Sequence, residues 1–323
     1  MHGWIILDKP LGLGSTQGVS AVKRALRQGG YGKLKVGHGG TLDPLATGVL
    51  PIAIGEATKL AGRMLDSDKM YDFTVAFGVE TDTLDLEGKA IAASDVRPTL
   101  AQIDAILPRF TGAIEQVPPA YSALKVDGER AYDLARAGEE VTLATRAVTV
   151  HSLLRHPGLV PGSTVPQTPG QAVPWMPEQV RHDGLVDTVT LTAHVFKGTY
   201  IRSLARDIAR ALGTVGHVTY LRRIKAGPFD LSHAISLDKL DEAAKGRTLE
   251  QHLLPLRAGL DDIPALALDP DQAGALRQGR VLAGIAEDAN SNGGLHFAML
   301  GDTPVALVEV TSGEARVVRG FNV

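Results

Sequence analysis

The segment 36–51, VGHGGTLDPLATGVLP, concentrates residue types that could do chemistry. Three glycines in four residues allow unusual backbone geometry or the close approach of a ligand. They precede Asp43, the only acidic residue between Asp8 and Glu56. A residue before proline is disfavoured in helical geometry, so the Asp43 carboxylate is displayed on extended chain. An Asx turn ended by Pro44 explains the same dipeptide, and the residues alone leave both interpretations open.

The composition limits which other groups could react. The 323 residues include no cysteine, which excludes disulfides, thiolate zinc sites, iron–sulfur clusters and a thiol nucleophile. Carboxylate, histidine, tyrosine, hydroxyl, lysine or arginine side chains must therefore do the chemistry. A hydrophobic content of 44% and a charged content of 21% are typical of globular proteins. Taken alone, the net charge of -3 argues mildly against a nucleic-acid partner.

The distribution of charge points the other way. Residues 1–64 carry eight Lys and Arg against three acids, and residues 197–225 carry seven against one. In the helix predicted over 200–212, arginine recurs every fourth residue, which predicts a cationic stripe formed by Arg202, Arg206 and Arg210. One such stripe is an ordinary solvated helix face, but two basic segments favour a polyanionic partner.

Apolar periodicity predicts the elements that position these residues. Strands are expected at 4–7, 49–54, 71–77 and 186–195, the last with the alternation of a half-buried antiparallel strand. Helices are expected after an N-cap at Ser15 or Thr16, after Pro98, and over 200–212. The Asp43 segment then falls in a loop between two buried elements, which is a usual place for function.

The outer parts of the chain differ in texture. Short strands at 295–299, 305–310 and 315–318 predict a small all-β domain near the C-terminus. The proline-rich segment 156–187 predicts an exposed, mobile surface insertion. The first apolar run, at 4–7, is too short for a signal peptide, and no apolar run is long enough to span a bilayer, so we expect a soluble, cytoplasmic protein.

A family resemblance rests on several blocks. The stretch 37–60, GHGGTLDPLATGVLPIAIGEATKL, resembles the catalytic motif of the TruB family of tRNA pseudouridine-55 synthases. Other blocks resemble further family motifs in the same order, and the likeness covers roughly residues 3–240; these blocks are 7–12, 65–71, 116–125, 197–204 and 216–223. The chain departs from the family at Gly14 and Gly39, where threonine is more frequent.

The resemblance implies an α+β fold. A mixed, largely antiparallel central sheet flanked by helices would form a pseudouridine synthase catalytic domain over residues 1–260, with the insertion at about 156–187. Residues 261–323 would form a small all-β, PUA-like RNA-binding domain.

The resemblance also implies roles for individual residues. Asp43 would be the nucleophile, Arg202 its ion-pair partner, and Tyr71 would stack on the uracil and help to remove the C5 proton. His38 would fill the space that the flipped base leaves, while Tyr200 and Leu221 would line the pocket. Further substrate and phosphate contacts would come from Lys9, Lys23, Arg24, Arg206, Arg210, Arg222 and Arg223.

The implied reaction isomerises uridine to pseudouridine at position 55 in the T loop of tRNA. The target base must be turned out of the folded loop, at a cost of a few kcal/mol. Asp43 could attack the ribose C1′ or the uracil C6, or assist loss of the 2′ proton, and the sequence does not choose among these routes. The reaction needs no cofactor and no metal, and nothing implies a protein partner, so we expect a monomer that binds tRNA.

Three rival interpretations stay open. A guide-RNA-dependent pseudouridine synthase shares the aspartate motif, and a non-catalytic chaperone would use the same basic groove to fold tRNA. A glycosidase would need a second carboxylate near Asp43, and the sequence offers no neighbouring one.

Overall fold

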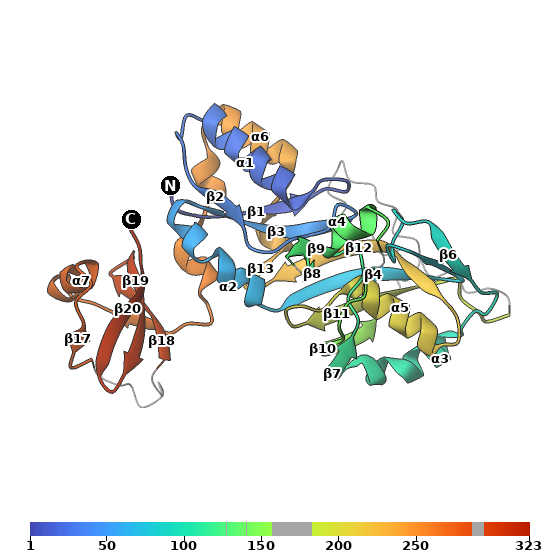
Figure 1. Ribbon diagram of the computed structural model, residues 1–323. Coiled ribbons are helices and arrows are strands. Elements are labelled where there is room, and N and C mark those ends of the chain that lie inside the picture. The colour runs from blue at the N-terminus through green and yellow to red at the C-terminus, as the bar shows by residue number, and fades with distance from the viewer. Residues whose placement is uncertain (127, 140, 157–182, 286–293) are drawn as a thin grey trace.

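The computed structural model describes residues 1–156 except 127 and 140, residues 183–285 and residues 294–323. Figure 1 shows a large part built on one long twisted sheet and a smaller part at the C-terminal end. The strands of the large part are β1 (Gly3–Lys9), β2 (Val36–His38), β3 (Ala46–Ile54), β4 (Lys69–Phe77), β5 (Val79–Thr81), β6 (Ala90–Ala93), β7 (Gly112–Gln116), β8 (Lys125–Val126), β9 (Glu129–Arg130), β10 (Arg146–Arg155), β11 (Thr188–Val195), β12 (Gly216–Ala226), β13 (Phe229–Asp230), β14 (Ala234–Ile235) and β15 (Leu254–Pro255).

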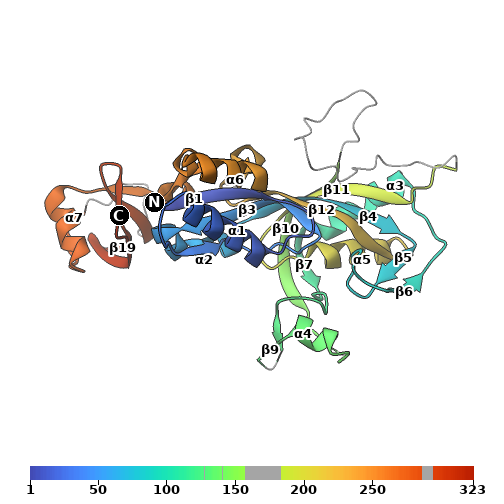
Figure 2. The same cartoon turned by 90° about the horizontal axis from the view of Figure 1, so that it is seen from above.

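Six α-helices belong to the same part of the chain. They are α1 (Ser15–Gln28), α2 (Ala61–Asp66), α3 (Leu100–Ile106), α4 (Ala131–Arg136), α5 (Ile201–Ala211) and α6 (Leu237–Gly246). Short 3-10 helices are η1 (Gly55–Lys59), η2 (Leu107–Phe110), η3 (Leu231–His233), η4 (Leu249–His252) and η5 (Leu256–Gly259). Figure 2 shows α4 and β9 standing out from the body of the sheet.

The described part of the central sheet has eleven strands. Eight follow the path β14-β1-β3-β12-β4-β11-β10-β7, while β13 pairs with β12, β15 with β1 and β2 with β3. Among the described strands of this sheet, β1–β14 and β3–β12 pair in parallel and the other pairs are antiparallel. The predicted α+β class with a mixed, largely antiparallel sheet is therefore confirmed.

The half of the sheet around β1 and β3 is covered on both faces. Side chains of a strand alternate between faces, so Ile5 and Leu7 pack against α1 and α6, while Trp4 and Ile6 pack against η1, α2 and η5. Helices α1 and α6 lie side by side on the first face (Figure 1). Burial on both faces explains why β1 and β3 are near-continuous apolar runs.

The half around β4, β11 and β12 is covered by α5 and α3. Phe73 and Val75 of β4, Leu191 of β11 and Leu204 and Ile208 of α5 belong to one buried cluster. The predicted alternation in β11 is confirmed except at Thr190: every second residue from Val189 to Val195 is buried, and Thr190 on the opposite face is buried as well. Helix α5 therefore packs along the sheet with one side, and its N-terminus lies at the edge where β4 and β11 meet the Asp43 loop.

The C-terminal part forms a second sheet in the order β16-β18-β19-β20-β17. Its elements are β16 (Ala265–Ala267), α7 (Pro270–Arg277), β17 (Leu282–Ala283), β18 (Gly294–Leu300), β19 (Thr303–Thr311) and β20 (Glu314–Gly320). The predicted strands are present, and the sheet also carries one helix. Phe297, Leu307 and Phe321 pack in one apolar cluster with Trp4 and Ile6 of β1, so the two parts share buried surface.

Some local expectations need correction or lie beyond the described residues. Helix α1 begins at Ser15 with Gly14 at its N-cap, so neither Ser15 nor Thr16 is the cap. The Ser15 hydroxyl instead bonds the backbone of Leu42. Most of the predicted insertion, residues 157–182, lies outside the described residues. Within the described chain, no helix combines the length and apolar character needed to cross a bilayer.

Candidate active site

Asp43 lies in the loop between β2 and β3, and the backbone of this loop is fixed at several points. The Ser15 hydroxyl accepts a hydrogen bond from the Leu42 amide at 2.8 Å and donates one to the Leu42 carbonyl at 2.9 Å. The Gly12 amide donates to the Pro44 carbonyl, also at 2.8 Å. These bonds pin the residues on both sides of Asp43, which leaves its carboxylate little freedom except side-chain rotation.

Two fully buried cations hold the same loop from below. The Lys9 ammonium, at the end of β1, donates to the Leu13 carbonyl at 2.6 Å and to the Pro44 carbonyl at 3.2 Å. The Arg223 guanidinium, in β12, donates to the carbonyls of Gly40, Thr41 and Val49. Buried polar groups must be satisfied internally, and here the loop carbonyls satisfy both cations.

Burial changes the acid–base behaviour of Lys9. Desolvation lowers the pKa of its ammonium to about 8; Asp43 raises this pKa and Arg223 lowers it. Burial favours the neutral form of a lysine, and a nearby carboxylate favours the charged form. The charge of Lys9 is therefore coupled to Asp43 although the two side chains form no ion pair in the described structure.

Two glycines of the motif are required by close approach. Gly48 has a φ of +98°, and a Cβ there would lie 2.2 Å from the Arg223 carbonyl oxygen. A Cβ at Gly39 would lie 2.6 Å from Cβ of Met64. A larger residue at position 39 would therefore clash with Met64 of α2 unless that side chain moved. This packing explains why glycine suits position 39 in this chain.

The predicted ion pair of the motif is present. Nη2 of Arg202, in the first turn of α5, lies 2.9 Å from Oδ2 of Asp43. The Arg202 side chain is 7% exposed and that of Asp43 is 41% exposed, so the cation is the buried partner and the carboxylate faces the cleft. Arg202 also donates to the carbonyls of Thr83 and Tyr121. The guanidinium is thereby fixed from three sides.

Asp85 is a site residue that the sequence analysis missed. Its Oδ2 lies 3.6 Å from Nη1 of Arg202, and its Oδ1 accepts hydrogen bonds from the Thr83 hydroxyl and the Glu87 amide. Asp85 thus balances the charge of Arg202 on the side away from Asp43. The group of acids near residue 85 was visible in the sequence, but nothing in its spacing tied it to Arg202, which lies 117 positions further along the chain.

A cleft of about 320 Å³ opens in front of Asp43. It brings together the predicted residues Tyr71, Tyr200, Leu221 and Arg202, from β4, from the residue before α5, from β12 and from α5. Burial raises the pKa of the Tyr200 phenol, and Asp43 also raises it. The predicted residues therefore place two tyrosine rings and Leu221 around a carboxylate, and Phe196 and several aliphatic side chains also line the cleft.

Lys69 also lines this cleft, and the sequence analysis assigned it no role. The Lys69 side chain is buried, and its ammonium donates to the carbonyls of Met64, Leu65 and Ser67 at the end of α2. Burial lowers the pKa of Lys69 to about 8; Arg223 lowers it further, while Asp66 and Asp68 raise it. Its position within the block 65–71 was the available signal.

His38 lies on β2, apart from the residues that line the Asp43 cleft. It is the last residue of β2, its Nδ1 accepts a long hydrogen bond from the Gly40 amide at 3.4 Å, and it is not among the residues described as lining the Asp43 cleft. Burial lowers the pKa of its imidazole, and Arg223 lowers it as well. The role expected for His38 in the RNA therefore stays a prediction.

The structure corrects part of the predicted phosphate-binding set. Lys9 and Arg223 are buried among loop carbonyls, so neither presents its charge at the surface. The stripe on α5 is not a free cationic face, since Arg206 pairs with Asp207 and Arg210 pairs with Glu80. Arg222 pairs with Asp8 at 3.0 Å, whereas Lys23 and Arg24 are exposed on α1, Arg24 at 3.8 Å from Asp241.

These features define what the site can do chemically. A fixed carboxylate with one buried guanidinium partner, in a cleft walled by aromatic side chains, suits nucleophilic or basic attack on a flat ring or on the sugar that carries it. In the part of the chain that the structure describes, the only group of His, Cys, Asp and Glu side chains close enough to hold a metal lies elsewhere, at Asp68, His151 and His194.

Comparison with known proteins places this geometry in a family. Residues 24–156 match the model for the TruB family pseudouridylate synthase N-terminal domain, and residues 202–261 match the model for the tRNA pseudouridylate synthase B C-terminal domain. The chain is 65% identical over 323 residues to tRNA pseudouridine synthase B of Novosphingobium aromaticivorans, covering all of this chain and 98% of that protein. It is 57% identical to the protein of the same name from Zymomonas mobilis, covering all of this chain and 96% of that protein.

Solved structures share the fold at much lower identity. An H/ACA ribonucleoprotein bound to a substrate RNA containing 2′-deoxyuridine includes a chain that is 22% identical, with a TM-score of 0.69, over 99% of this chain and 85% of that one. A chain of a Cbf5-Nop10-Gar1 complex is 24% identical, with a TM-score of 0.69, over 99% of this chain and 84% of that one.

Proposed function

The chain belongs to the TruB family of pseudouridylate synthases, and we infer from this that it is an isomerase that converts uridine to pseudouridine at position 55 in the T loop of tRNA. The observation that supports this inference for particular residues is the 2.9 Å ion pair between Asp43 and Arg202, which lines the same cleft as Tyr71. We propose that these three residues perform the reaction.

Asp43 acts as the nucleophile or base that starts the rearrangement. The bond between N1 of uracil and C1′ of the ribose breaks, the base turns within the cleft, and a bond forms between C5 and C1′. Arg202 holds the carboxylate at a fixed position, which removes the entropic cost of orienting it in each turnover. All three routes, through C1′, through C6 or through loss of the 2′ proton, start from this same carboxylate.

Tyr71 and Tyr200 hold the uracil after it leaves the T loop. Stacking of a flipped base on an aromatic ring is worth about 1–3 kcal/mol, which offsets much of the few kcal/mol needed to unstack it. Leu221 closes the apolar side of the cleft. Once the new bond has formed, Tyr71 helps to remove the proton from C5, its phenol passing on its own proton as it accepts this one, while N1, released from the sugar, takes up a proton. His38 fills the space that the base leaves in the RNA.

Binding of the tRNA body lies outside the cleft. Lys23 and Arg24 are exposed on α1, where they can contact phosphates, and Arg206, Arg210 and Arg222 can do so only by sharing their acidic partners. We propose that residues 261–323 form a PUA-like domain that extends this surface beyond the catalytic domain of residues 1–260. One chain supplies every residue of the cleft, so we propose a monomer, acting in the cytoplasm where tRNA is present.

The fold is shared with H/ACA ribonucleoproteins, so a guide-RNA-dependent synthase is the second candidate. Identities of 22–24% to those chains stand against 57–65% to proteins named tRNA pseudouridine synthase B. We therefore favour the stand-alone enzyme. Pseudouridine formation on a bare tRNA transcript, with no guide RNA and no protein partner, separates the two.

The test of the proposal is Asp43→Asn, which keeps the size of the side chain and removes its charge. We expect the variant to bind a T-stem-loop RNA within a fewfold of the unchanged protein and to form no pseudouridine, measured by mass spectrometry of the RNA. Full turnover by the variant would exclude Asp43 as the nucleophile. Loss of both binding and folding would be resolved by Asp43→Glu, which keeps the charge and should restore binding without normal turnover.

A further inference from the structure

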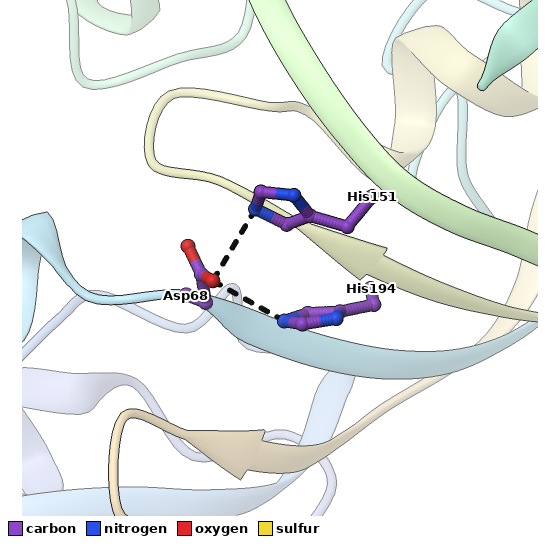
Figure 3. A group of neighbouring side chains, drawn as sticks. All are labelled: Asp68, His151 and His194. Carbon is purple, nitrogen blue, oxygen red and sulfur yellow. Dashed lines mark ion pairs between the residues drawn. The ribbon is translucent and has the colours of Figure 1, made fainter. Parts of the chain in front are cut away.

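A second cluster of reactive side chains lies outside the Asp43 cleft. Oδ2 of Asp68 is 3.2 Å from Nε2 of His151 and 3.3 Å from Nε2 of His194. Figure 3 shows both imidazoles turned toward the same carboxylate from neighbouring strands, β10 and β11, while Asp68 comes just before β4. The cluster is therefore assembled from three segments that are far apart in the sequence and adjacent in the sheet.

The backbone is arranged to bring the two histidines to one face. In the pairing of β10 with β11, Val150 faces Val195 and Ser152 faces His194, so His151 is the extra residue of a β-bulge. A regular strand would send alternate residues to opposite faces, and a bulge re-aims the side chain at the irregular position. Bulges of this kind are frequent beside functional sites.

The distances fit a shared metal ion. A tetrahedral zinc ion has ligand bonds of about 2.0–2.1 Å to imidazole nitrogen and carboxylate oxygen, which places neighbouring donor atoms about 3.3 Å apart. The two distances to Asp68 already have this length, and all three donor atoms lie within 4.8 Å of one another. The three donor atoms are therefore close enough to bind one ion together.

The surroundings leave these ligands available. Among the residues that the structure describes, His151 and His194 are the only ion-pair partners of Asp68. Each of the three side chains is between 36% and 39% exposed. Asp68 and His194 also line a cleft of about 480 Å³, which gives room for water as a fourth ligand. A structural zinc site has four protein ligands, whereas this set leaves one position open.

We propose that Asp68, His151 and His194 form a binding site for a divalent transition-metal ion of the Zn²⁺ class. Two imidazoles and one carboxylate suit Zn²⁺ and its neighbours in the first transition row, while Mg²⁺ and Ca²⁺ prefer oxygen ligands. The ion ties β10 and β11 to the start of β4, one residue before Lys69. This site is separate from Asp43 and takes no part in the rearrangement of the uridine.

The test uses metal-free full-length protein and Zn²⁺ alone, titrated by calorimetry. We expect one Zn²⁺ per chain, and binding about tenfold weaker or more in His151→Gln and in His194→Gln, because each loses one of three protein ligands. His233→Gln is the matched control, since His233 pairs with Asp230 at 3.1 Å without a second imidazole. The control should bind Zn²⁺ as the unchanged protein does, and millimolar Mg²⁺ should not displace the ion.

Equal affinity in all these proteins, or no saturable binding to the unchanged protein, would overturn the proposal and leave a pair of hydrogen bonds to Asp68. A second measurement does not depend on the variants folding. Zn²⁺ should protect His151 and His194 of the unchanged protein from modification by diethyl pyrocarbonate, mapped by peptide mass spectrometry, and should not protect His233. Equal modification with and without Zn²⁺ would also reject the site.

Discussion

Two carboxylates of this protein, Asp43 and Asp68, have almost the same exposure and different partners. Their side chains are 41% and 39% exposed, and each lies at the edge of a cleft. Asp43 is paired with Arg202, a buried permanent cation that is itself fixed by two carbonyls. Asp68 is paired with two imidazoles, whose side chains are 38% and 36% exposed.

The difference shows that the partner, more than the exposure, determines what a surface carboxylate can do. A guanidinium has no lone pair to offer and keeps its charge at every physiological pH, so it can only orient the anion of Asp43. A neutral imidazole offers a nitrogen lone pair and can share a cation with the carboxylate. One arrangement suits an attacking group, and the other suits a ligand set.

The largest effect is expected from removing the fixed cation. Arg202→Met leaves Asp43 and Asp85 without their shared partner, and breaking a pair with one buried member costs about 3 kcal/mol. We expect this loss in the free energy of unfolding, measured in urea, and at least about a 100-fold loss of turnover.

The control is Arg210→Met on the same helix, because Arg210 pairs with Glu80 and its side chain is 57% exposed. An exposed pair is worth about 1 kcal/mol or less, so the control should lose far less stability. Equal losses in the two variants would contradict the assignment of Arg202 as the buried partner. Arg202→Lys should recover part of the stability and little of the turnover, since lysine lacks the planar fork.

An effect of intermediate size concerns the two buried lysines, one beside each carboxylate. The pKa of Lys9 and that of Lys69 are both lowered from 10.5 to about 8, chiefly by burial. Between about pH 8 and 10.5 the unfolded chain therefore binds more protons than the folded chain, so the free energy of unfolding contributed by these groups rises with pH. Below pH 8 both states are protonated, and the cost of burying the charge is fully present.

The measurement is the free energy of unfolding at pH 7 and at pH 10 for the unchanged protein, Lys9→Met and Lys69→Met. Methionine does not titrate, so the unchanged protein should gain about 2 kcal/mol relative to each variant over this range. A difference that stays constant or shrinks with pH would show that the ammonium groups are not destabilised by burial.

The smallest effect separates the two regions most directly. Asp43 raises the pKa of Lys9, whereas Asp66 and Asp68 raise that of Lys69. Asp68→Asn should therefore lower the pKa of Lys69 and leave that of Lys9 unchanged. Asp43→Asn should lower the pKa of Lys9 and leave that of Lys69 unchanged. NMR titration of the two side-chain ammonium groups measures both values, and a shift of both lysines in either variant would show that the regions are one electrostatic unit.

The sequence was enough to predict the Asp43 loop and its ion pair with Arg202. Asp43 stands out because a single acid, before proline, follows a run of glycines, and Arg202 follows from the family resemblance. The main strands could be predicted because β1, β3 and β11 have simple apolar patterns that their burial confirms. Patterns within short segments of the sequence were therefore sufficient to predict these strands and the Asp43 loop.

The remaining features depend on contacts between distant segments. Lys9 and Arg223 are candidates for phosphate contacts in the sequence because both lie in its basic segments, yet loop carbonyls accept hydrogen bonds from both of them. The ion pair between Asp85 and Arg202 could not be predicted, because the packing of α5 brings these two distant residues together. The bulge at His151 changes which face that residue occupies, and the sequence has no mark of the irregular register.

The carbonyl contacts of Lys9 and Arg223 have an evolutionary consequence. Both cations bind the main chain of the Asp43 loop, and the main chain is the same whatever side chain a position carries. The loop should therefore tolerate changes of residue type at exposed positions such as Thr41. An insertion or deletion of one residue would shift the register of the carbonyls and move the carboxylate away from Arg202. Selection should therefore constrain the length of this loop more strongly than the residue type at most of its positions.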